Sequence, residues 1–96
     1  MEVKEVIETW RPEILGYLID MRDFHQEEDC RLILRNLSAY SARASYMRNF
    51  ASRSNNEKIN RFRIDELDPF LVEVERQFKI YSRLISANQF EFDLTK

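Results

Sequence analysis

The sequence predicts an all-α fold, with three observations behind the prediction. Apolar residues recur at alternating steps of three and four along three segments, which is the spacing of one helix face. The 96 residues include one Gly and two Pro, so few positions interrupt a helix. We expect a small three-helix bundle, or a helical hairpin completed by dimerisation, with a short extended C-terminal tail. The expected layout is one helical domain over residues 1–88, with helices at about 3–24, 28–52 and 66–87, and a tail over 89–96.

The first predicted helix carries an apolar stripe along its whole length. Its members are Val3, Ile7, Trp10, Ile14, Tyr17, Met21 and Phe24. Pro12 is tolerated only in a first helical turn or at a kink, so Thr9 is a candidate N-cap that would leave residues 3–8 as a separate turn. Beyond Phe24 the stripe would continue onto charged residues. We therefore expect a break between Phe24 and Glu28.

The second predicted helix has an apolar surface wider than a narrow coiled-coil seam. Its central stripe consists of Cys30, Ile33, Leu37, Tyr40, Ala44, Met47 and Ala51. Beside that stripe lie Leu32, Ala39, Tyr46 and Phe50, which we interpret as the flank of a buried face that touches two neighbouring helices. The polar segment Ser52–Asn60 follows, and Ser54-Asn55-Asn56 is its best loop candidate.

The third predicted helix has a stripe formed by Leu67, Leu71, Val74, Phe78, Tyr81 and Ile85. Asp68 before Pro69 fits an N-cap followed by a proline in the first turn, with a start one turn earlier, at Asp65, as the alternative. After Asn88 the apolar period changes to two, with Phe90, Phe92 and Leu94 alternating with polar residues. This pattern predicts an extended docking tail; the alternative is a frayed helix end.

Charge is strongly divided along the chain. The formal net charge of −2 combines −6 over residues 1–29, +7 over 30–64 and −3 over 65–96. In the basic segment Arg31, Arg35 and Arg53 point away from the central stripe, and small residues lie between them. Arg43 and Arg48 flank that stripe. The arginines of the basic segment either pair with the acidic helices of the bundle, which we favour, or bind an acidic protein or nucleic acid. A sequence pI near 5.4 weighs against nucleic acid.

The composition excludes most catalytic chemistry. With one His and one Cys, the chain lacks the ligands of a zinc site and the residues of a nucleophilic triad. His25 is therefore expected to be a structural or surface residue, Cys30 a buried structural thiol, and Glu27 with its acidic neighbours the start of a helix. We expect no cofactor, no metal and no enzymatic activity. A lone cysteine, no apolar run of membrane-spanning length and no signal-peptide pattern favour a reducing, cytoplasmic location without a membrane partner.

The sequence thus predicts a non-enzymatic helical interaction or adaptor protein that acts through protein–protein contacts and self-association. A two-fold homodimer would let the acidic patch of one copy meet the basic patch of the other twice. The alternative is a nucleic-acid-binding or regulatory helical protein that uses the basic segment 31–63. The expected partner-binding residues are Arg31, Arg35, Ser38, Ala42, Tyr46, Arg53, Arg61, Arg63, Phe90 and Phe92.

Overall fold

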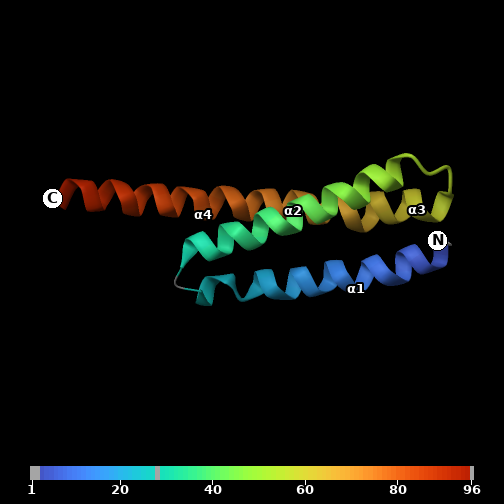
Figure 1. Cartoon of the computed structure of the whole chain (residues 1–96), viewed down its shortest axis with the longest axis horizontal. Helices are drawn as coiled ribbons and strands as arrows, with labels where there is room; N and C mark the ends of the chain where they lie inside the picture. Colours follow the sequence, from blue (N-terminus) through green and yellow to red (C-terminus); the bar gives the residue numbers. More distant parts are fainter. Residues whose placement is uncertain (1–2, 28, 96) are drawn as a thin grey trace.

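The computed structural model describes the backbone of residues 3–27 and 29–95, and the side chains of these residues up to 86. It confirms the all-α three-helix bundle, and no strand occurs within the described ranges (Figure 1). The elements are α1 (Val3–Arg22), the short 3-10 turn η1 (Phe24–Gln26), α2 (Cys30–Ser52), α3 (Glu57–Phe62), the π-helical turn η2 (Arg63–Leu67) and α4 (Asp68–Thr95). Because α3, η2 and α4 follow one another without a gap, they form a single third rod.

The break between the first two helices lies where the sequence predicts it. After η1, the Asp29 side chain caps α2 by accepting a hydrogen bond of 3.0 Å from the Arg31 backbone N–H. Pro12, however, lies inside an uninterrupted α1, so Thr9 does not begin a separate helix. Val6 and Trp10 on the preceding turns are buried, and this packing keeps the backbone helical before the proline.

The third rod begins earlier than predicted. Its cap is Asn56, whose side chain accepts hydrogen bonds from the backbone N–H groups of Lys58 (2.9 Å) and Ile59 (3.2 Å). Asp68 is the first residue of α4, but it does not cap a free helix end as predicted, because η2 leads directly into it and the Asp68 N–H donates to the Arg63 carbonyl. A proline ring needs space where the carbonyl four residues earlier would lie, and the wider π turn directly before Pro69 supplies that space.

The predicted extended tail is also wrong. The backbone of α4 continues as a helix to Thr95, and in Figure 1 it projects past the ends of α1 and α2. Adding residues to an existing helix carries no nucleation cost, so a short period-two pattern does not end it. The side chains of Phe90 and Phe92 lie outside the described residues. The molecule is elongated, with extents of 58 × 22 × 18 Å.

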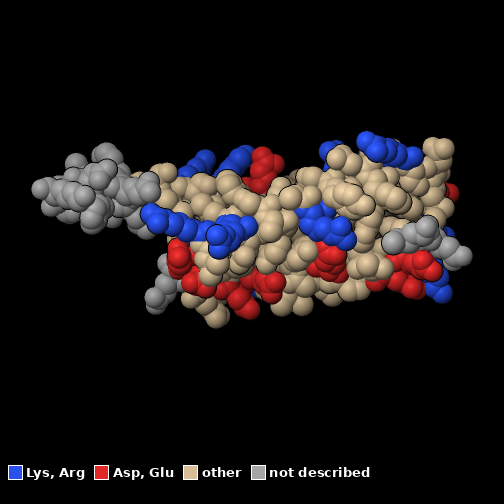
Figure 2. All heavy atoms as spheres, viewed as in Figure 1, with Lys and Arg blue, Asp and Glu red and all other residues tan. Residues whose placement is uncertain are grey.

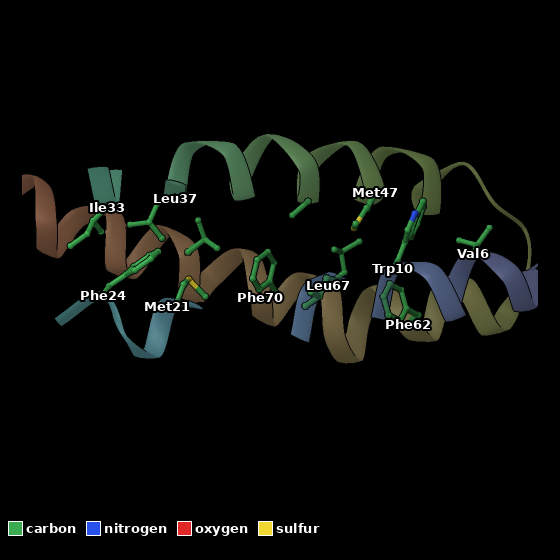
Figure 3. Packing of buried hydrophobic residues seen from close by; sticks show 13 residues of the cluster. Val6, Trp10, Met21, Phe24, Ile33, Leu37, Met47, Phe62, Leu67 and Phe70 are labelled. Atoms are coloured by element: carbon green, nitrogen blue, oxygen red, sulfur yellow. The ribbon is translucent and has the colours of Figure 1, made fainter. Parts of the chain in front are cut away.

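One hydrophobic core runs along the bundle and includes Trp10, Leu37, Met47 and Phe70, as Figure 3 shows. Aromatic rings tie the helices together: Tyr17 of α1 stacks on Tyr40 of α2 with 4.3 Å between ring centroids. The four residues interpreted as a buried flank of α2 are instead exposed. Ala39 is exposed, and Leu32, Tyr46 and Phe50 have relative exposures of 40%, 59% and 42%. None of the four belongs to the core cluster, although the ring of Phe50 packs edge-on against the buried Trp10. No helix in the described part of the chain is long and apolar enough to cross a membrane.

Candidate interaction surface

Six of the predicted partner-binding residues lie together on the solvent side of α2. All six are exposed, and their spacing places them on one face of the helix, which we call the outer α2 face: Arg31, Arg35, Ser38, Ala42, Tyr46 and Arg53. The structure thus places these six side chains on one exposed face; their role in partner binding stays a prediction. Small residues occupy its middle and arginines its two ends.

The arginines of the basic segment divide into two groups. Several pair inside the bundle, as predicted: the Arg43 guanidinium lies 2.7 Å from a Glu13 oxygen, and Arg48 lies 3.0 Å from an Asp68 oxygen. Within the described residues, by contrast, no carboxylate lies within 4.0 Å of Arg31, Arg35 or Arg53. Among the arginines of the basic segment 30–64, these three have no ion pair with a described carboxylate.

Arg61 and Arg63 are not part of the outer α2 face. Arg61 is exposed on α3 and lies 3.8 Å from an Asp65 oxygen. Arg63 begins the π turn, is half-buried and lies 3.4 Å from an Asp68 oxygen. Both arginines thus face carboxylates of the third rod, away from the outer α2 face.

A groove adjoins the outer α2 face on the side of α4. Its volume is about 620 Å³. The residues that line it are Ser38, Ser41 and Ala42 of α2 and Leu71, Val74, Glu75, Phe78 and Lys79 of α4. The groove exists because the α2 residues are small, and it leaves Phe78 with 38% of its surface exposed. Sequence reasoning missed the α4 wall because it assigned Leu71 and Phe78 to the core stripe; the run of small α2 residues opposite them was the available signal.

Between α1 and α2 lies a partly buried polar network. Arg43 donates to Glu13, which also accepts a hydrogen bond of 2.7 Å from the Tyr17 hydroxyl. The hydrogen bond from Arg43 lowers the pKa of the Glu13 carboxyl below its usual value. Burial, together with donation to Asp20 over 3.1 Å, raises the pKa of Tyr40 to about 12. This network fixes α1 and α2 side by side.

The described residues contain no group of three or more His, Cys, Asp and Glu side chains that could hold a metal ion. Cys30 is half-buried rather than fully buried, and His25 is exposed on η1. No known protein family, curated protein or solved structure matches this chain. The functional argument therefore depends on the surfaces alone.

Proposed function

We propose that this chain is a non-enzymatic helical interaction protein that binds an acidic amphipathic helix of a partner protein and also associates with its own copies. The observation that carries the proposal is the α2–α4 groove beside the outer α2 face. The groove has an apolar floor and a low wall of small residues. Beside it, the outer α2 face carries arginines that have no ion pair with a described carboxylate.

The groove has the features that helix-in-groove recognition uses. Leu71, Val74 and Phe78 offer apolar contacts to the buried side of an incoming helix. Ser38 and Ala42 allow the partner backbone to approach closely, because their side chains are short. The partner's large side chains then fill the space that these short side chains leave open.

Charge selects the kind of partner helix. Arg31 and Arg35 lie toward one end of the outer α2 face and Arg53 toward the other, while the groove's own Lys79 already lies 3.4 Å from a Glu75 oxygen. Acidic residues flanking the apolar side of a partner helix would complement these arginines and set its orientation. A basic helix would meet like charges and be rejected.

The nucleic-acid alternative is weaker in this fold. Arg43, Arg48, Arg61 and Arg63 are engaged with carboxylates of the chain itself. A phosphate backbone would have to displace those carboxylates or bind through the few arginines that remain. Protein binding needs no such displacement.

The test compares two exposed apolar residues replaced by the same charge. Ala42→Glu places a carboxylate at the groove, whereas the control Leu15→Glu changes a residue of α1 that is 54% exposed. Each tagged full-length chain is expressed in its native cell, and the bound polypeptides are identified by mass spectrometry. A candidate acidic helix from a captured protein is then synthesised and titrated against both purified variants.

The proposal expects the synthetic acidic helix to bind the wild type and Leu15→Glu alike, and to bind Ala42→Glu at least about tenfold more weakly. Equal binding to all three proteins would place the partner site elsewhere. In parallel, the wild type is titrated with random-sequence DNA and RNA over a salt series. Binding that falls steeply with salt would favour the nucleic-acid reading and overturn the proposal.

A further inference from the structure

We infer that two copies of this chain pack against each other through the surface shared by α1 and α2, about a two-fold axis near Gly16 and Ala39. We call this surface the α1–α2 face. On α1 it comprises Glu5, Thr9, Gly16, Asp20 and Asp23, and on α2 it comprises Leu32, Asn36, Ala39, Tyr46 and Phe50. The inference deepens the self-association part of the proposed function and rests on it.

The two helices present this face as one continuous surface. The Tyr17–Tyr40 stack and the Arg43–Glu13 ion pair bridge α1 and α2 directly beneath it. Gly16 and Ala39 each precede one of the stacked tyrosines in sequence, so they lie at the same level along the bundle. The middle of the face is therefore built from the two smallest residues, and the helix ends carry the larger side chains.

Nothing in the structure of a single copy requires a glycine at position 16. A glycine in a helix interior costs about 1 kcal/mol relative to alanine. Its φ is not positive, and a Cβ placed on it would meet nothing within 4 Å. Neither backbone conformation nor packing in the monomer requires a glycine here. Close approach of another helix at this point would account for it.

The α2 half of the face exposes large apolar groups. Tyr46 and Phe50, toward the C-terminal end of α2, are 59% and 42% exposed. Leu32, near its N-terminal end, is 40% exposed. Phe50 is already held in place from below, with its ring edge-on to Trp10 at 5.4 Å. Rigid aromatic side chains of this kind lose little conformational entropy when a partner covers them, which is why they are common at the centres of interfaces.

Charge identifies a second copy as the occupant. Acidic side chains gather along α1 and basic side chains along α2 on this side of the molecule (Figure 2), and by helical position Arg35 and Arg53 border the α1–α2 face beside Tyr46. A two-fold axis places α2 of one copy across α1 of the other, so each basic strip meets an acidic strip and the pairing occurs twice. Packing α2 on α2 instead would bring the arginine-rich faces together, which like-charge repulsion disfavours.

The test measures the dimer dissociation constant of full-length variants by sedimentation velocity. Gly16→Leu fills the middle of the face with a residue that favours helix, and Ala39→Glu places a charge there. The control is again Leu15→Glu, on the same helix as Gly16 but turned away from the face. Circular dichroism checks that each variant keeps the helical content of the wild type.

We expect Gly16→Leu and Ala39→Glu to raise the dissociation constant at least about tenfold and Leu15→Glu to leave it unchanged. Arg35→Glu with Arg53→Glu should weaken the dimer, and adding Glu5→Arg with Asp23→Arg to the same chain should restore it. An unchanged dissociation constant for Gly16→Leu overturns the inference. So does a failure of the added Glu5→Arg and Asp23→Arg substitutions to restore dimerisation. A wild type that never dimerises, yet binds an acidic helix in an Ala42-dependent manner, overturns this inference and leaves the partner site standing.

Discussion

Replacing Gly16 with alanine is expected to stabilise the isolated chain. Gly16 lies in the interior of α1 (Val3–Arg22), and the added Cβ would meet nothing within 4 Å. The gain is therefore the full helix-propensity difference of about 1 kcal/mol, with no steric term to subtract from it. For a domain of this size, about 1 kcal/mol corresponds to a rise in melting temperature of roughly 4–8 °C.

The assay is urea denaturation followed by circular dichroism at about 0.1 µM, well below a micromolar dissociation constant, where the dimer is largely dissociated. Ala39→Gly is the matched control on α2, because it makes the reverse change at an exposed helical position and should lose about the same free energy of unfolding. Unchanged or reduced stability in Gly16→Ala would refute the reasoning. It would mean that the backbone at Gly16 is already crowded in a single copy.

Three further predictions concern the network and the core. Arg43→Gln should lower the free energy of unfolding at pH 7 by about 1 kcal/mol, a figure reduced for the partial exposure of the pair. Because the folded-state pKa of Glu13 is depressed, this difference should shrink as the pH falls through and below the ordinary carboxyl range, which acid titration of both proteins measures. The folded-state pKa of Tyr40 is raised to about 12, so the wild type should lose stability as the pH rises from about 10 toward that value. The Tyr40→Phe variant should lose less stability over the same range, which alkaline denaturation curves of both proteins test. Trp10→Ala should cost about 3–5 kcal/mol, because Trp10 is buried and packs on Phe50 and Phe62; urea midpoints by circular dichroism give the value.

The inward stripes could be predicted from sequence because helix periodicity reports directly on burial. Ile14, Met21, Leu37 and Val74 belong to the predicted stripes and are buried. The prediction that Leu32, Ala39, Tyr46 and Phe50 form a buried flank of α2 was wrong for a related reason. Tyr46 is apolar enough to resemble a core residue, and periodicity alone does not distinguish a second buried face from an exposed one.

In the third rod, tertiary packing overrides a local helix-start signal in the sequence. Asp68 and Pro69 form a favourable helix start in isolation, but Asn56 supplies a cap upstream and the buried Phe62 holds the helix between them. The π turn that admits Pro69 has no sequence signature, so the continuous rod was not foreseeable. At the other end, the alternation over residues 90–95 predicts an extended tail, but it follows an uninterrupted helix whose backbone continues to Thr95.

The positions of the candidate interaction residues follow in part from the sequence. The positions of Arg35 and Ala42 followed from the helical wheel of one segment, which needs no tertiary information. The groove did not follow, because it depends on which α4 residues lie opposite Ser38. Likewise, the ion pair of Arg43 with Glu13 joins two helices, and only the fold shows which arginines remain without described carboxylate neighbours.

The account depends most on association through exposed helix faces, and sedimentation equilibrium of the wild-type chain at about 50 µM tests it most directly, since a micromolar dissociation constant gives mostly dimer there. The account predicts a species with twice the 11.7 kDa chain mass that dissociates on dilution and in high salt. A species of single-chain mass at every concentration would contradict it.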